Sequence, residues 1–289
     1  MSSTIPHEEY VVECPPGTSF GCLLGAGLSG FAAHLEVAIK WPGGKYDLSR
    51  ERQVYERLGN RHTGILHYYG SHEKGWLILQ YANNGPIRHY LQDATEPIPN
   101  SLRLRWIEQI ATAIAFLHSE SILHADISCN NVFLDDNLDA KIGDFAGSSI
   151  DGSDPLCWYE TRSNLPGYRP ISSRNEIFAL GSTFFEIMTG KRPYPDLEEH
   201  VVENAYREGK FPELDSLEWG STVIDKCWRG GYNSMDFLVE DVQAEVARHS
   251  PATESTVNRP IPRLQVSRLI SMLLCSIPIV SFAVWRIRR

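Results

Sequence analysis

Hydrophobic residues follow several different spacings along this chain of 289 residues. Residues 31–40 and 76–81 contain short apolar runs with β-favouring side chains, which predict strands. Residues 47–58 combine a capping residue, a charged face and apolar positions at helical spacing, which predicts a helix. A longer apolar helix is predicted over residues 176–190, where a glycine closes it. The pattern therefore places strands and one short helix early in the chain and a long helix later.

A polar stretch lies between these two regions, at residues 124–131, with the sequence His-Ala-Asp-Ile-Ser-Cys-Asn-Asn. An Asp-Phe-Ala tripeptide begins eighteen residues after Asp126, at Asp144. Transfer of a γ-phosphoryl group needs a carboxylate near the acceptor hydroxyl and oxygen ligands that hold Mg²⁺ against the phosphates. Asp126 can supply the first, and Asn131 and Asp144 can supply the second. One such residue alone is more often a turn former or a solvated acid, so the prediction depends on the whole ordered set.

A glycine pattern precedes these residues. Gly25, Gly27 and Gly30 have the spacing GxGxxG, and the apolar run after them ends at Lys40. Dinucleotide-binding folds use the same spacing where a strand leads into a helix. Here the residues on both sides favour β structure, so we expect a hairpin whose backbone closes over phosphates. Lys40 would reach these phosphates from the next strand.

Together these motifs resemble those of the eukaryotic protein kinase family, over residues 18–245. The resemblance implies an α+β, two-lobed protein-kinase fold with a small β-rich N-lobe at residues 18–81 and a large helical C-lobe at residues 82–245. Residues 1–17 would form an N-terminal extension. Residues 176–190 resemble the central helix of the large lobe, and Cys227 with the following tryptophan resembles a core pair of a late helix.

The resemblance also implies ATP and Mg²⁺ as cofactors and assigns roles to single residues. Glu51 would hold Lys40, with Glu56 as the solvated alternative. Leu79 would be the gatekeeper beside a hinge whose backbone binds adenine. The implied catalytic residues are Asp126, Lys40, Asn131 and Glu51; the nucleotide-binding residues are Gly25, Gly27, Gly30, Ala38, Lys40, Gln80, Ala82 and Phe133; and the metal ligands are Asn131 and Asp144.

The chain departs from the family pattern at several positions. Ala125 replaces the arginine that pairs with a phosphorylated activation loop, so we expect no switching of that kind. Ser128 replaces the lysine typical of Ser/Thr kinases and leaves the acceptor class open. Ala146 replaces a glycine, which removes backbone freedom but no ligand. The closing Ala-Pro-Glu is absent, with Pro-Gly-Tyr at 166–168, and its arginine partner is replaced by Met235.

Three functions are compatible with these motifs. The favoured one is a protein kinase that transfers the γ-phosphoryl of ATP to protein hydroxyls, with Ser/Thr preferred and Tyr left open. A pseudokinase scaffold that binds nucleotide weakly or not at all is the alternative, because of the departures just described. A small-molecule kinase is the second alternative, since sugar and amino-alcohol kinases share the HxD loop. The helix at residues 176–190 argues against the last.

Length and composition fit one catalytic unit and little else, with 42% hydrophobic residues. Six cysteines without CxxC or zinc spacing favour a reducing compartment. Residues 246–289 have a net charge of +6, which leaves −15 on residues 1–245. An acidic body would attract basic acceptor peptides, although such a charge also serves solubility. The first 245 residues contain no basic patch that indicates nucleic acid, and the oligomeric state is not indicated.

The C-terminal tail differs from the rest. Residues 246–268 are predicted to be a disordered linker, because Ser, Thr and Pro recur there. Residues 269–285 carry no formal charge and lie between arginines, at the lower length limit of a bilayer span. The pattern predicts a transmembrane tail anchor in an intracellular membrane, with the kinase unit in the cytoplasm. The alternative is a peripheral or partner-binding helix.

Overall fold

The computed structural model describes residues 23–27, 30–33, 35–43, 47–167 and 170–249, with side chains from residue 35 onward. The first described elements are strands β1 (Leu23–Gly27) and β2 (Gly30–Ala33), which pair antiparallel with Gly27 opposite Gly30. The glycine-rich segment therefore forms a hairpin, as the sequence predicts.

A second sheet contains strands β3 (Val37–Lys40), β4 (Tyr68–Ser71) and β5 (Leu77–Gln80), in the order β3-β5-β4 with antiparallel pairing. Lys40 lies opposite Leu77, and Ala38 lies opposite Leu79. Along β5 the buried Leu77 and Leu79 alternate with half-buried neighbours, because successive side chains of a strand point to opposite faces. The strand predicted at residues 76–81 is confirmed.

Helix α1 (Ser49–Leu58) follows β3. The Asp47 carboxylate accepts the backbone N–H of Ser49 at 3.1 Å just before the helix, and Gly59 ends it in the left-handed conformation with a φ of 58°. Its inner face buries the predicted apolar residues together with one carboxylate, that of Glu51. The predicted helix is confirmed. Its core-facing side also carries the buried carboxylate of Glu51.

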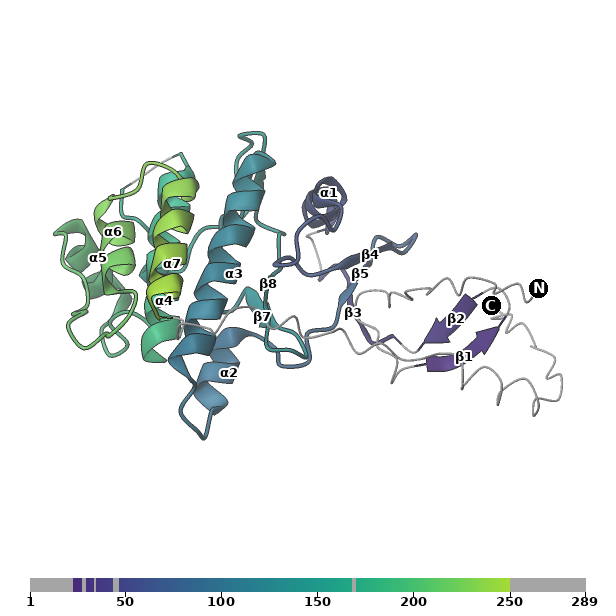
Figure 1. The fold of residues 1–289 in the computed structure, drawn as a ribbon. Helices are drawn as coiled ribbons and strands as arrows, with labels where there is room; N and C mark the ends of the chain where they lie inside the picture. Colours follow the sequence, from purple (N-terminus) through teal and green to yellow (C-terminus); the bar gives the residue numbers. More distant parts are fainter. Residues whose placement is uncertain (1–22, 28–29, 34, 44–46, 168–169, 250–289) are drawn as a thin grey trace, which may run out of the picture. The chain divides into compact units, whose positions relative to one another are not determined.

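Six α-helices make up nearly half of the described residues after β5. They are α2 (Ile87–Asp93), α3 (Asn100–Ser119), α4 (Ser173–Thr189), α5 (Glu199–Arg207), α6 (Ser221–Arg229) and α7 (Met235–His249). Helix α3 packs against α4 and α7, and α4 packs against α6 (Figure 1). Helix α4 starts with a capping box between Ser172 and Asn175 and is buried along almost its whole length. The predicted long apolar helix is thus at the centre of this helical part.

Two small strand pairs carry the polar loops. Strand β6 (Ile122–Leu123) pairs with β9 (Ser149–Ile150), and β7 (Val132–Leu134) pairs with β8 (Ala140–Ile142). The loop at residues 124–131 runs from β6 to β7, and the loop at residues 143–148 runs from β8 to β9. Because both loops connect the same two strand pairs, their ends are fixed at neighbouring positions.

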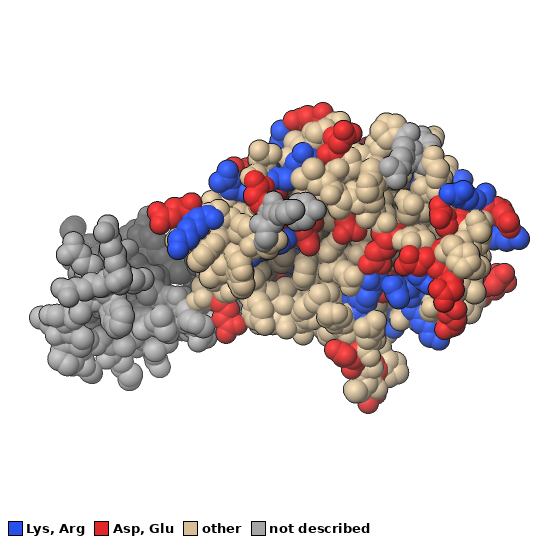
Figure 2. Space-filling view, turned by 180° about the vertical axis from the view of Figure 1, so that it is seen from behind, with Lys and Arg blue, Asp and Glu red and all other residues tan. Residues whose placement is uncertain are grey.

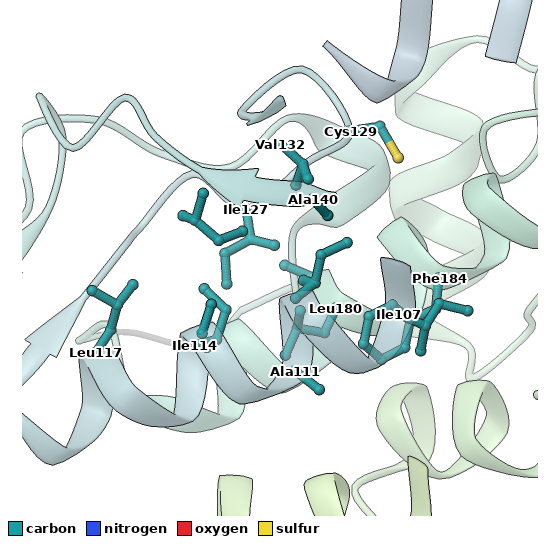
Figure 3. Packing of buried hydrophobic residues seen from close by; sticks show 14 of the residues in the cluster. Ile107, Ala111, Ile114, Leu117, Ile127, Cys129, Val132, Ala140, Leu180 and Phe184 are labelled. Atoms are coloured by element: carbon teal, nitrogen blue, oxygen red, sulfur yellow. The ribbon is translucent and has the colours of Figure 1, made fainter. Parts of the chain in front are cut away.

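The hydrophobic core packs against the loop at residues 124–131. One face of α3 contacts α4 and the loop at residues 124–131 (Figure 3). The labelled side chains are Ile107, Ala111, Ile114 and Leu117 of α3, Leu180 and Phe184 of α4, and Ile127, Cys129, Val132 and Ala140. Each fully buried Leu, Ile, Val or Phe side chain contributes roughly 1.5–3 kcal/mol to the free energy of unfolding. Ile127 and Cys129 therefore attach the polar loop to the core.

Ion pairs at the surface connect α1 and the residues just after it to segments that follow α3 and β9. Arg57 of α1 binds Asp151 with both guanidinium NH₂ groups at 2.7 Å, and Arg61 binds Glu120 at 2.7 and 2.9 Å. Acidic and basic side chains lie intermixed on the face shown in Figure 2. Solvent screens such exposed pairs, so the buried apolar contacts supply most of the stability.

Several predicted segments lie outside the described residues. These are the N-terminal extension at residues 1–17, the predicted linker from residue 250 to residue 268, and the hydrophobic segment at residues 269–285. Among the helices that the structure describes, none has the length and apolar character needed to cross a membrane. Helix α7 extends to His249, so residues 246–249 are helical and the linker predicted from residue 246 cannot begin before residue 250.

Candidate active site

Three charged side chains from distant segments meet at the end of β3. The Lys40 ammonium lies 2.7 Å from Glu51 Oε2 and 2.8 Å from Asp144 Oδ1. Pairing of β3 with β5 fixes Lys40, and the amphipathic character of α1 turns Glu51 inward, where it is fully buried. Glu56, the alternative partner, is exposed and pairs with Arg52 at 3.7 Å.

The charges of Lys40, Glu51 and Asp144 shift one another's pKa values. Burial alone would lower the pKa of Lys40, but the two carboxylates outweigh it and raise the pKa. Burial alone would raise the pKa of Asp144, yet the charge and hydrogen bond of Lys40 hold that pKa below its ordinary value. Burial raises the pKa of Glu51, and Lys40 offsets only part of that effect. Asp144 is therefore an ionised carboxylate suited to binding a cation.

The loop at residues 124–131 orients the carboxylate of Asp126. Asn131 donates its side-chain N–H to Asp126 Oδ2 at 2.9 Å and to the Asp126 carbonyl at 2.7 Å. His124 Nε2 forms a 3.0 Å hydrogen bond with the Gly143 carbonyl. Ala125 has a φ of +69°, a conformation that costs an L-residue about 1–3 kcal/mol. The backbone N–H of Ala125 donates to Glu176 of α4 at 2.8 Å, which holds this turn in place.

Asp126 has an environment that favours its protonated form more than water does. Burial raises its pKa, and the nearby carboxylates of Glu160 and Asp144 act in the same direction. His124 and the hydrogen bond from Asn131 oppose the increase only in part. Asp126 is therefore a carboxylate with increased proton affinity, as a proton acceptor requires.

Asp144 is aimed at Lys40 by the backbone of its own loop. Its φ is +60°, again in the left-handed region, and the Gly143 N–H donates to the Asn131 carbonyl at 3.1 Å. A Cβ on Gly143 would lie 2.5 Å from Leu66 Cδ1, so any larger residue here would displace the Leu66 side chain. Phe145 is fully buried and contacts Tyr55 of α1 edge to face at 5.0 Å. The loop thereby connects α1 with the segment around Asp126.

The residues after Phe145 accommodate the unusual alanine. Ala146 is absent from the described residues that have a positive φ, so the replacement of glycine costs no backbone strain there. Gly147 is the position that requires glycine, because a Cβ would lie 1.8 Å from Cys157 Sγ. Burial raises the pKa of the Cys157 thiol to about 12, so this side chain is a neutral packing group.

The described contacts place only some of the residues that are expected around the adenine. Ala38 on β3 and Phe133 on β7 are half-buried, and Leu79 is buried beside Ala38. The Gln80 N–H donates to the His67 carbonyl, and the Ala82 carbonyl accepts the Gly85 N–H. Gly25, Gly27 and Gly30 lie in the β1–β2 hairpin, whose side-chain surroundings fall outside the described residues.

Sequence reasoning missed several buried polar residues near the site. Arg88 of α2 binds Glu186 at 2.7 and 2.9 Å and Glu160 at 2.9 Å, and Asn130 donates to Glu160 at 3.1 Å. No local pattern predicts this network, because its members come from four separate segments. A single arginine or glutamate in sequence is normally a solvated residue.

The end of the segment that begins at Asp144 is held by contacts that no sequence motif indicates. The buried Arg162, in the short helix η2 (Thr161–Ser163), donates to the carbonyls of Pro193, Tyr194 and Leu197 at 3.0, 3.2 and 2.5 Å. Met235, where the family has an arginine, is a buried core residue. Three backbone carbonyls thus accept the hydrogen bonds of one buried guanidinium near the end of this segment.

Comparison with known proteins identifies the family. The family model described as protein tyrosine and serine/threonine kinase matches residues 19–234. Human tyrosine-protein kinase ZAP-70 is 26% identical over 230 residues, which cover 72% of this chain and 36% of ZAP-70. The RGS domain-containing serine/threonine-protein kinase A of Dictyostelium discoideum is 27% identical over 209 residues, which cover 67% of this chain and 19% of that kinase. The inactive tyrosine-protein kinase kin-32 of Caenorhabditis elegans is 24% identical over 222 residues, covering 70% and 26%.

The aligned region spans little more than a third of these relatives at most. The family model nevertheless covers well over half of this chain. A small sheet region followed by a larger set of helices fits the two-lobed kinase fold. The chain therefore belongs to the eukaryotic protein kinase family.

Proposed function

We propose that this chain is an ATP- and Mg²⁺-dependent protein kinase that transfers a phosphoryl group to protein hydroxyls. The supporting observation is that two arrangements occur together. Lys40 contacts Glu51 and Asp144 at the same time, while Asn131 holds the carboxylate of Asp126. Phosphoryl transfer depends mostly on positioning and charge neutralisation, which this set of residues can provide.

The side chains present fit a magnesium ion. Asp144 offers ionised carboxylate oxygens and Asn131 an amide oxygen, and Mg²⁺ prefers such hard oxygen ligands. The described residues contain no group of three or more His, Cys, Asp or Glu side chains that could hold a metal ion alone. Nucleotide phosphates would therefore complete the coordination, as is usual for Mg²⁺ in kinases. When bound, the ion would neutralise charge on the phosphates beside Lys40.

The adenine would bind at the hinge after β5. The Gln80 N–H is used within the sheet, so its carbonyl is the group proposed to reach the ligand. The Ala82 carbonyl is used in a turn, so its N–H is proposed as the donor. Ala38 and Phe133 would contact the two faces of the ring, and the β1–β2 hairpin would cover the phosphates.

The acceptor is proposed to be a serine or threonine hydroxyl, with tyrosine as the alternative. A second function, that of a nucleotide-binding scaffold, is favoured by the geometry of Ser128. Its side chain is buried, and its Oγ accepts the Asn130 N–H at 3.3 Å, so it cannot replace a lysine that reaches the transferred phosphoryl group. Relatives that include an enzyme named as inactive are compatible with this second function.

Transfer by the purified full chain tests the proposal. The protein is incubated with Mg²⁺ and γ-labelled ATP against peptide libraries that contain Ser, Thr or Tyr, and the parallel reaction contains Asp126→Asn protein. We expect label in Ser/Thr peptides with the wild-type chain alone. Nucleotide binding without transfer to any library would instead establish the scaffold function.

For the tail, we propose from the sequence that residues 269–285 anchor the protein to an intracellular membrane, with the kinase domain on the cytoplasmic side. The uncharged run between arginines supports this proposal.

A further inference from the structure

The segment from residue 144 to 166, here called the activation segment, has an attachment that none of its sequence motifs indicates. Tyr159 donates its hydroxyl to Glu176 Oε1 at 2.9 Å. The same oxygen accepts the backbone N–H of Ala125 at 2.8 Å. Ala125 immediately precedes Asp126, the proposed proton acceptor. A single carboxylate oxygen therefore joins the activation segment to the loop that carries Asp126.

The groups that form this connection are buried and therefore shielded from solvent. Glu176 is fully buried, and Tyr159 is 7% exposed. His118 of α3 contacts the other carboxylate oxygen, Oε2, at 2.7 Å. Burial would raise the pKa of Glu176, but His118 and the N–H of Ala125 hold it below its ordinary value. Burial also raises the pKa of Tyr159, so a protonated hydroxyl faces an ionised acceptor, and hydrogen bonds to charged acceptors are the stronger kind.

The surrounding segment is consistent with an anchor at Tyr159. Leu156 and Trp158 are exposed, whereas Cys157 and Tyr159 turn inward, so the extended chain alternates between solvent and core. An acceptor polypeptide would meet the outward face while the inward face is fixed. The buried hydroxyl of Tyr159 is inaccessible to another kinase, which excludes Tyr159 as a phosphorylation site in this conformation.

We propose that Tyr159 is a positioning residue that aligns the activation segment with Asp126 through Glu176. This inference deepens the proposed protein kinase function and rests on it. Ala125 removes the arginine through which a phosphorylated segment could be attached, and the Tyr159 hydroxyl provides an attachment that needs no phosphate. The contacts of Lys40, Asn131 and Asp144 do not involve Tyr159, so nucleotide binding is independent of the hydroxyl.

The test compares Tyr159→Phe with Tyr232→Phe in the full chain. Tyr232 is a matched control, because it is also buried and donates its hydroxyl to a carboxylate, Asp241 Oδ2, at 2.9 Å, far along the chain from the site. We expect Tyr159→Phe to lower kcat/KM for the acceptor peptide about tenfold while the Kd for nucleotide changes less than twofold. Tyr232→Phe should leave both unchanged. Equal loss of thermal stability in the two variants, with turnover below Tm unchanged in both, would overturn the proposal in favour of a merely structural role.

Hydrogen exchange supplies a readout that does not need activity. Peptides that cover residues 122–128 and 155–160 should exchange faster in Tyr159→Phe than in wild type, and Tyr232→Phe should not change them. If the wild-type chain transfers no phosphoryl group, the kinase proposal fails, while exchange still decides whether the attachment exists. Unchanged protection in Tyr159→Phe would refute the attachment itself.

Discussion

At the scale of single residues, the site depends on two backbone positions in a conformation that L-residues seldom adopt. Ala125 and Asp144 both have φ values near +60 to +70°. Each is fixed by a neighbour, Ala125 through Glu176 and Asp144 through Lys40. Strain of this kind persists only where surrounding contacts determine it, and it is typical of functional sites.

Asp126 and Asp144 should respond differently to removal of charge. Asp126→Asn should abolish phosphoryl transfer and change nucleotide affinity less than about twofold, because its carboxylate is proposed to act on the acceptor hydroxyl. Asp144→Asn should reduce both transfer and Mg²⁺-dependent nucleotide binding, since it is the proposed metal ligand. Turnover assays combined with thermal-shift titrations of ATP, with Mg²⁺ or EDTA, measure both effects. Wild-type turnover in Asp126→Asn would refute the assigned mechanism.

The pH dependence of transfer follows from the raised pKa of Asp126. Only the ionised carboxylate accepts a proton, and burial raises its pKa above the ordinary value of about 3.9. As the pH falls through this raised pKa, the ionised fraction decreases, so kcat/KM should fall tenfold per pH unit below it. Rates measured from neutral pH downward, with circular dichroism at each pH to verify folding, test this. A rate that is constant down to pH 4 in folded protein would contradict it.

At the scale of elements, α1 is attached to the activation segment as well as to β3. Arg50 Nη1 donates to the Ser148 carbonyl at 2.6 Å and to Ser153 Oγ at 2.9 Å. Glu51, the next residue, pairs with Lys40. Because adjacent residues of one helix make both contacts, a shift of the segment would also shift the Lys40–Glu51 pair.

Phosphorylation of the activation segment should have little effect on activity. Ser148, Ser149, Tyr159 and Ser163 are buried, so Ser153 and Thr161 are the half-buried hydroxyls of this region. Ala125 supplies no cation for an added phosphate, so little ordering energy is gained. Phosphatase treatment should change the rate less than about twofold, equivalent to ~0.4 kcal/mol. A hundredfold loss would indicate that Arg50 binds a phosphate on Ser153.

The buried network of α2 and α4 should contribute strongly to stability. Arg88→Met leaves Glu186 buried without its cation, and breaking a buried pair in this way costs about 3–5 kcal/mol. The free energy of unfolding is measured by urea titration. The exposed Arg61, which pairs with Glu120, is the control, and Arg61→Ala should hardly change the midpoint. Equal decreases in the free energy of unfolding for the two substitutions would show that burial does not increase the contribution of Arg88 to stability.

At the scale of the whole molecule, charge and hydrophobicity separate the C-terminal tail from the acidic remainder. A reporter fused to residues 246–289 should sediment with membranes and resist carbonate extraction. The uncharged run at residues 269–285 is short, so Leu274→Arg together with Val280→Arg should prevent insertion at a cost of about 2.5–3.5 kcal/mol each. Recovery of the unmutated fusion in the carbonate supernatant would refute the spanning anchor.

Features that depend on neighbouring residues could be predicted from the sequence alone. The glycine hairpin, α1, β5 and α4 follow from capping residues, turn residues and hydrophobic spacing, which act over a few positions. The cluster at residues 124–131 with Asp144 was evident from its order and indicated phosphoryl transfer. These local signals were sufficient for the family and for the candidate catalytic set.

The tertiary structure alone decided which distant groups pair. It selected Glu51 rather than Glu56 for Lys40, because α1 turns only Glu51 into the core. It joined Arg88 to Glu186, which are 98 residues apart, and Tyr159 to Glu176. It also placed the guanidinium of Arg162 against three backbone carbonyls. Such contacts have no local signature, because a polar residue becomes a partner only when packing removes it from water and brings another segment within hydrogen-bond distance.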